Sequence, residues 1–211
     1  MSEIAVSELN PRVAVASESP LHGAPVGVAV VDDAAAAGVA VREEAFLGHL
    51  VLRGNAADAG FVAGVERALG LALPVAPCVL HGDEARGVSV QWSSPDEWLI
   101  IVPAGEEYGT ELRLREALDG HFAVVNVSGG QTLLTLTGPA VRDVLMKSTP
   151  YDVHPRNFPV GKAVATVFGK AAAVIRRPAE DRWELVIRRS FADYLFAWLL
   201  DASEEFGVHV V

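Results

Sequence analysis

The sequence predicts an α+β fold in two similar lobes, because one succession of features occurs twice along the chain. In each copy an alternating strand ends at a glycine that precedes a helix, first at Gly54 and again at Gly138. Each copy later carries a tryptophan that begins an aliphatic run, at Trp98 and Trp183. The glycines are 84 residues apart (138 minus 54) and the tryptophans 85 (183 minus 98). These near-equal offsets indicate an internal repeat.

The order of elements gives the architecture of each lobe. The first copy reads as a strand at 46–53, a helix at 56–69, strands at 88–92 and 98–102, a helix at 107–118 and a strand at 122–127. The second reads as a strand at 131–136, a helix at 139–147, strands at 162–168, 171–177 and 183–188, and a helix at 190–204. The βαββαβ order of the first copy is the ferredoxin-like order. We therefore predict two ferredoxin-like, pseudo-repeated α/β-sandwich lobes with antiparallel sheets, each covered by helices on one face.

The segment before the repeat has a different character. Residues 1–40 mix Ser, Glu, Pro, Ala and Gly without a sustained helical or strand period. We expect an extended N-terminal arm, which either drapes over a partner or is disordered. The expected organisation is an arm at 1–40, a first lobe at 41–127 and a second lobe at 128–211.

Composition and charge exclude several classes of protein. The 211 residues are 51% hydrophobic and 21% charged, which is enough to bury a sizeable core. A net charge of −10 and a pI near 5.0 argue against nucleic acid as a partner, because phosphate binding needs a basic surface. The N-terminus lacks the basic region of a secretory signal, and the longest apolar stretch, 24–41, is interrupted by Asp32 and Asp33. The sequence predicts a cytoplasmic protein that does not span a membrane.

The sequence lacks the patterns of known cofactor-binding, metal-binding and catalytic sites. No G-x-G-x-x-G occurs, and Gly129-Gly130 fits a tight turn between the lobes better than a phosphate loop. The six histidines never have the spacing of three or four residues that places two metal ligands on one helical turn. Cys78 is the only cysteine, and its neighbours Pro77 and Val79 suggest an inert apolar position. We therefore predict no catalytic, cofactor-binding or metal-binding residue in this chain.

The two repeated tryptophans have a structural and a functional interpretation. Each begins an aliphatic strand, where a large ring fills the space between a sheet and its helices. The alternative is a ligand-stacking role. The double occurrence of Trp98 and Trp183 favours core anchoring.

The last predicted helix is the strongest sign of a partner. Apolar side chains leave only a narrow polar stripe along 190–204, so this helix requires burial on two sides. Its own sheet can cover one face, and either the other lobe or another subunit must cover the rest. The residues that we expect at a partner interface are Leu21, Arg188, Arg189, Tyr194 and Trp198.

A set of short motifs, densest from residue 126 onward, has a recognisable order and spacing. They are Ser19-Pro20-Leu21, Pro95-Asp96-Glu97-Trp98-Leu99, Ser128-Gly129-Gly130-Gln131-Thr132, Gly138-Pro139-Ala140, Leu145-Met146-Lys147, Pro150-Tyr151-Asp152, His154-Pro155, Phe158-Pro159-x-Gly161 and Arg189-Ser190-Phe191-Ala192-Asp193-Tyr194-Leu195. Together they resemble the gamma subunit family of heterotetrameric sarcosine oxidase. The resemblance spans nearly the whole chain.

The resemblance implies a non-catalytic structural or assembly subunit. The complex it implies oxidatively demethylates sarcosine to glycine, yielding hydrogen peroxide and formaldehyde or, with tetrahydrofolate, its methylene derivative. FAD, FMN, NAD, tetrahydrofolate and zinc would lie on the alpha, beta and delta subunits, with no cofactor in this chain. The family is also similar in fold to the folate-binding region of glycine-cleavage aminomethyltransferase, so the alternative is a small folate-binding one-carbon transferase-like protein.

Overall fold

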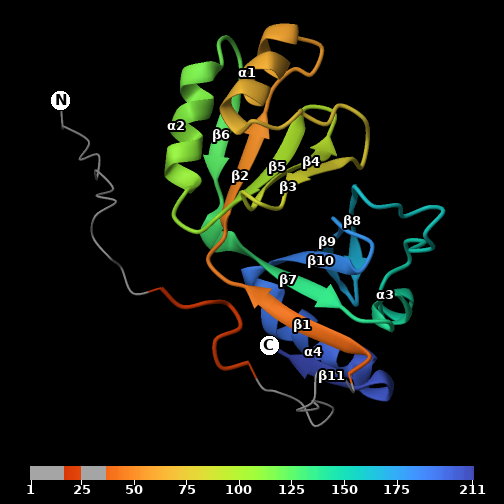
Figure 1. Ribbon diagram of the computed structural model, residues 1–211. Helices are drawn as coiled ribbons and strands as arrows, with labels where there is room; N and C mark the ends of the chain where they lie inside the picture. Colours follow the sequence, from red (N-terminus) through yellow and green to blue (C-terminus); the bar gives the residue numbers. More distant parts are fainter. Residues whose placement is uncertain (1–16, 25–36) are drawn as a thin grey trace.

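The first lobe is a five-stranded sheet with two helices on one face (Figure 1). Its elements are β2 (Gly48–Arg53), α1 (Ala59–Leu69), β3 (Leu80–Asp83), β4 (Val88–Ser94), β5 (Glu97–Val102), α2 (Glu107–Ala117) and β6 (Ala123–Asn126). The strand order is β3-β4-β5-β2-β6, and every neighbouring pair is antiparallel. This is the predicted ferredoxin-like lobe with one extra edge strand. Strand β3 was not predicted from the sequence, because its four residues carry a single apolar side chain.

The second lobe repeats this plan in a six-stranded sheet. Its elements are β1 (Val39–Glu44), η2 (Ser128–Gly130), β7 (Gln131–Thr137), α3 (Val141–Ser148), β8 (Lys162–Phe168), β9 (Ala171–Arg177), β10 (Arg182–Arg188), η3 (Arg189–Phe191), α4 (Ala192–Ser203), η4 (Glu204–Phe206) and β11 (Val208–Val210). The strand order is β11-β1-β7-β10-β9-β8, antiparallel except for the parallel pair of β1 and β11. The α+β class and the antiparallel sheets are therefore as predicted.

Strand β1 precedes the first lobe in sequence but lies in the sheet of the second. It pairs antiparallel with β7, in the place that β6 holds beside β2 in the first lobe. The expected boundary at residue 41 falls within this strand. The computed structural model describes residues 17–24 and 37–211, so most of the expected arm, at 1–16 and 25–36, lies outside the described residues. No helix in the described part of the chain is long and apolar enough to cross a membrane.

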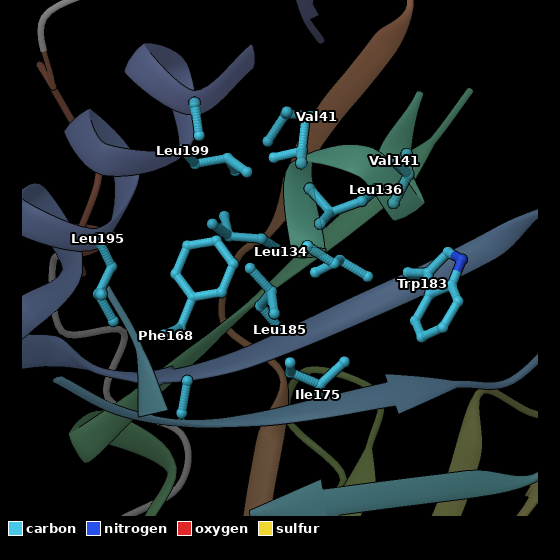
Figure 2. Close-up of a cluster of buried hydrophobic side chains, with 14 of the residues drawn as sticks. Val41, Leu134, Leu136, Val141, Phe168, Ile175, Trp183, Leu185, Leu195 and Leu199 are labelled. Carbon is cyan, nitrogen blue, oxygen red and sulfur yellow. The ribbon is translucent and has the colours of Figure 1, made fainter. Parts of the chain in front are cut away.

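Each lobe has its own apolar core between its sheet and its helices, and each core contains a repeated tryptophan. Trp98 is fully buried; its ring centroid lies 5.6 Å from that of Phe61, and its Nε1 donates a hydrogen bond of 2.7 Å to the Pro74 carbonyl oxygen. In the second core, Trp183 lies at one end of the cluster drawn in Figure 2, with its ring 5.0 Å from that of Phe158. Burial of both rings among core residues confirms the core-anchoring interpretation.

The repeated glycines are required by close packing at the start of the first helix of each lobe. A Cβ atom on Gly54 would lie 2.2 Å from Cε2 of Phe61, so the ring can pack there only because the side chain is absent. Gly138 has a φ of +117°, and a Cβ atom on it would lie 2.4 Å from the carbonyl oxygen of Gly38. That carbonyl accepts the N–H of Ala140, which joins the segment before β1 to the start of α3.

Candidate functional site

Helix α4, the expected partner-binding helix, is covered largely by its own lobe. Its buried residues face the second core, and the helix packs against α3 and β10. Leu195 and Leu199 point into this core together with Phe168 of β8 (Figure 2). The second lobe therefore covers most of the apolar surface of α4, and part of its first turn, at Tyr194, remains exposed.

Tyr194 and Trp198 of α4 hold the turn between β8 and β9. Their ring centroids lie 6.4 Å apart, and a Cβ atom on Gly169 in this turn would be 3.0 Å from each side chain. The Tyr194 hydroxyl accepts the N–H of Lys170 at 3.0 Å, and Nε1 of Trp198 donates to the Ser148 hydroxyl at 3.1 Å. Tyr194 remains 38% exposed, whereas Trp198 is half-buried against the core. Of the two, Tyr194 has the more accessible side chain for a partner.

The other expected interface residues lie near the start of α4 or on the described N-terminal segment. Both terminal nitrogens of Arg189 donate to the Glu18 carbonyl oxygen at 3.3 Å. Leu21 packs against the second core, and the Ser19 hydroxyl donates to the Glu43 carboxylate at 2.6 Å. Arg188 ends β10 with an exposed side chain. The structure thus brings residues 17–24 and the start of α4 together on the second lobe.

A cleft opens where the helix-free faces of the two sheets meet. These faces share a small apolar cluster formed by Leu99, Ile101, Leu133 and Val186. Beside that cluster lies a cleft of roughly 340 Å³ with walls from both lobes. Its lining residues are Arg42, Glu44, Leu47, Leu80, Gly82, Asp83, Glu84, Gly87, Val88, Ser89, Ile101, Leu133, Thr135, Gly161, Arg176, Pro178, Arg182 and Glu184.

Arg176 of β9 is the most unusual side chain in this cleft. It is only 3% exposed and is the cross-strand neighbour of Glu184 on β10. Its Nε lies 3.0 Å from Oε2 of Glu184, at ion-pair distance but outside hydrogen-bond geometry. Its Nη2 donates to the Ser89 hydroxyl at 2.7 Å, across the lobe boundary, and its Nη1 has no hydrogen-bond partner among the described residues. Burial lowers the pKa of Arg176, and the facing Glu184 carboxylate opposes that shift.

Ion pairs extend this charge network to the cleft mouth. Arg182 donates to Glu84 at 2.7 Å across the lobe boundary, and its Nε lies 3.5 Å from Glu184. On β1, Nε of Arg42 donates to Glu44 at 2.8 Å, and the Thr135 hydroxyl donates to the same Glu44 oxygen at 3.0 Å. Most charges of the cleft are therefore neutralised in pairs.

His49 lies buried on the same face of the first sheet. Its Nδ1 is hydrogen-bonded to the Leu47 carbonyl oxygen at 3.0 Å, while its Nε2 has no partner among the described residues. Burial, with a smaller contribution from the charge on Arg176, lowers the pKa of His49 to about 4. The ring is therefore neutral at pH 7.

The candidate metal-ligating and nucleophilic side chains can be located in the described part of the chain. No three His, Cys, Asp or Glu side chains there lie close enough to hold a metal ion. Cys78 packs against the second core, as its apolar neighbours in sequence suggested. Sequence reasoning overlooked Arg176 and Glu184, and the available signal was a charged residue at an inward-facing position within an apolar strand.

Comparison with known proteins places the chain in a family. The model of the sarcosine oxidase, gamma subunit family matches residues 53–205. The chain belongs to this family. The sarcosine oxidase subunit gamma of Corynebacterium sp. (strain P-1) is 36% identical over 179 residues, which cover 85% of this chain and 87% of that protein.

Solved structures agree with this placement. The chain is similar to a chain of the heterotetrameric sarcosine oxidase from Corynebacterium sp. U-96 in complex with pyrrole 2-carboxylate. The TM-score is 0.80 at 33% identity, and the match covers 90% of this chain and 96% of that one. It also resembles the glycine cleavage system aminomethyltransferase T from Bartonella henselae, with a TM-score of 0.62 at 16% identity over 83% of this chain and 48% of that one. The second likeness is one of fold.

Proposed function

We propose that this chain is the gamma subunit of a heterotetrameric sarcosine oxidase and acts there as a non-catalytic assembly subunit. The observation that carries the proposal is the match to one chain of such an enzyme, at a TM-score of 0.80 and over 96% of that chain. The family match over residues 53–205 supports it independently.

The chemistry of the described residues fits an assembly role. The buried charges Arg176 and Glu184 face each other, and His49 is buried and neutral. The partners would be the alpha, beta and delta subunits, which would carry FAD, FMN, NAD, tetrahydrofolate and zinc. The complex would oxidise sarcosine to glycine, and this chain would hold it together.

We place the partner surface around η3 and the first turn of α4. Phe191 is 45% exposed and Tyr194 38% exposed, and the exposed Arg188 and Arg189 lie next to them in sequence. Aromatic and arginine side chains are enriched among the residues that dominate interface energetics. Leu21 would contribute from the adjacent N-terminal segment, whereas Trp198 would act mainly within the chain.

Co-expression of the other subunits with and without this chain tests the assembly role. We expect the complex to lose stability and activity when the chain is omitted. A fully stable and fully active complex without it would refute the proposal.

Variants of the exposed aromatics test the surface. Phe191→Ala and Tyr194→Ala should weaken co-purification with the partners, whereas Tyr108→Ala, which removes a 53% exposed ring from α2, should not. The opposite pattern would move the interface to α2 and leave the assembly role intact.

The alternative function, a folate-binding one-carbon transferase-like protein, is tested separately. Calorimetric titration of the full chain with tetrahydrofolate should give no saturable heat. Saturable binding would favour the alternative over a purely structural subunit.

A further inference from the structure

The sheet of the second lobe leaves part of its helix-free face uncovered. Side chains alternate along β8 and β9, so Phe168 and Ile175 point into the second core, as Figure 2 shows, and the positions between them point away from it. The apolar residues at these outward positions that remain exposed or half-exposed are Ala165, Val167, Ala172 and Val174. The register pairs the first with the last and the middle two with each other, so the four form one patch, the β8–β9 face.

The composition of the β8–β9 face is unusual for a sheet surface in water. An antiparallel sheet with one solvated side normally carries polar side chains on that side. None of the four residues is polar, and Val167 is 43% exposed. At its inner end the face is already covered, because Val174 packs against the apolar cluster that the two lobes share. The exposed part therefore continues a buried apolar surface, which indicates that it too is covered in the assembled protein.

The charges at the outer end of the β8–β9 face are positive. Ile187 of β10 is the cross-strand neighbour of Ala173, so the next residue, Arg188, lies beside Ala172 on the helix-free side. Lys170 lies in the turn that joins β8 to β9. Both residues are exposed, and neither side chain has an ion-pair partner in the part of the chain that the structure describes. Two unpaired cations at the rim of an apolar face favour an acidic partner.

The same charges separate another subunit from a second copy of this chain. A symmetric contact between two copies would bring the β8–β9 face against itself. Arg188 and Lys170 of both copies would then border one interface, and the face has no carboxylate to pair with them. A different protein can supply that carboxylate. The turn at Lys170 is also held by Tyr194, so the β8–β9 face adjoins the partner surface placed above at the first turn of α4.

We propose that the β8–β9 face binds an aliphatic segment of another subunit, which sets a carboxylate against Arg188. It rests on the assembly role proposed above and extends the partner surface from the first turn of α4 around the β8–β9 turn. The small side chains of Ala165 and Ala172 let the segment approach the sheet closely. Val167 and Val174 provide the apolar contact, and the carboxylate pairs with the exposed guanidinium.

Competition for a place in the complex tests the apolar contact. The wild-type chain and a variant are co-expressed with the other subunits, and intact-mass spectrometry of the purified complex gives their ratio. Val167→Lys puts an ammonium group into the aliphatic contact, so its share should fall at least about tenfold below that of wild type. Val75→Lys is the matched control, because Val75 is 58% exposed in the connection from α1 to β3, and it should enter as well as wild type.

Arg188→Glu tests the carboxylate in the same assay. Reversal of this charge should also lower the share at least about tenfold. Arg142→Glu is its control, because Arg142 is an exposed arginine of α3, on the helix-covered side of the sheet. Thermal unfolding of each purified chain excludes misfolding, and the comparison rests on Arg188→Glu, at an exposed strand end, if Val167→Lys proves unstable. Entry of Arg188→Glu at the wild-type level would overturn the charge pairing.

The outcomes distinguish the surface from the assembly role. Absence of the wild-type chain from the complex would overturn both. Equal entry of wild type and Val167→Lys would overturn the β8–β9 face as a contact surface and leave the assembly role intact. Sedimentation of the isolated full chain tests the remaining occupant: a wild-type dimer that Val167→Lys dissociates would assign the face to a second copy and overturn the proposal.

Discussion

Replacing Trp198 by alanine distinguishes packing within the chain from contact with a partner. The indole covers the turn at Gly169, packs against the second core and donates to the Ser148 hydroxyl at 3.1 Å. These contacts predict that the variant destabilises the isolated chain. If the indole contacted only a partner, its removal would leave the stability of the isolated chain unchanged.

The structure sets the size of the effect. Truncation of a fully buried tryptophan costs about 3–5 kcal/mol, and because Trp198 is half-buried we expect about half of this. Loss of the hydrogen bond adds about 1 kcal/mol. Ser148 is not left unpaired, because its hydroxyl also donates to the Val144 carbonyl oxygen at 2.7 Å. The expected total of about 3 kcal/mol corresponds to a fall in thermal midpoint of roughly 6–12 °C for a chain of this length.

Thermal and urea unfolding of the isolated full chain measure this directly. Tyr194→Phe is the matched control, because it keeps the ring and loses only a hydroxyl that accepts from the exposed N–H of Lys170. We expect it to cost less than about 1 kcal/mol. Wild-type stability of Trp198→Ala, together with loss of the complex, would refute the reasoning and assign the indole to a partner.

Three further perturbations test the pH dependence of stability, the repeated glycine and the pairing of β1 with the second sheet. Burial lowers the pKa of His49 to about 4, so the neutral ring's contribution to stability is complete above about pH 6.5 and is lost as the pH falls toward 4. The loss amounts to about 3 kcal/mol in total. Urea unfolding at several pH values should show that His49→Asn lacks this dependence of the unfolding free energy on pH. Gly138→Ala should lower the unfolding free energy by at least about 2 kcal/mol, because φ is +117° there and the new Cβ would lie 2.4 Å from a carbonyl oxygen. Gly129→Ala is the control in thermal unfolding, and it should cost little because no atom lies within 4 Å of its Cβ. Deletion of residues 1–44 removes β1 and leaves the edge of β7 unpaired, so size-exclusion chromatography should show self-association that deletion of residues 1–16 does not cause.

The repeat could be predicted because its signals are local. Alternating apolar residues define a strand within its own few positions, and the predicted strands at 162–168 and 171–177 coincide with β8 and β9. The two tryptophans were assigned to the core because each begins such a run. In both cases the neighbouring residues in sequence determine the outcome.

The features that were missed depend on distant residues. Strand β1 has only two core-facing valines, Val39 and Val41, and its strand character comes from pairing with β7 about 95 positions later. The charge network of the cleft requires the register that sets Arg176 opposite Glu184. Neither pairing can be deduced from a local pattern, because side-chain periodicity does not specify which strands are neighbours.

Strand β1 contributes residues both to the second core and to the cleft between the lobes. Its valines lie in the second core, while Arg42 and Glu44 line the cleft. The next three residues, 45–47, lead directly into β2, which is an inner strand of the first sheet. Rotation of one lobe against the other would therefore strain this short connection, separate the apolar faces and break the ion pair of Arg182 with Glu84. Strand β1, which spans the expected boundary between the arm and the first lobe, thus completes the second core, lines the cleft and limits how far the two lobes can move apart.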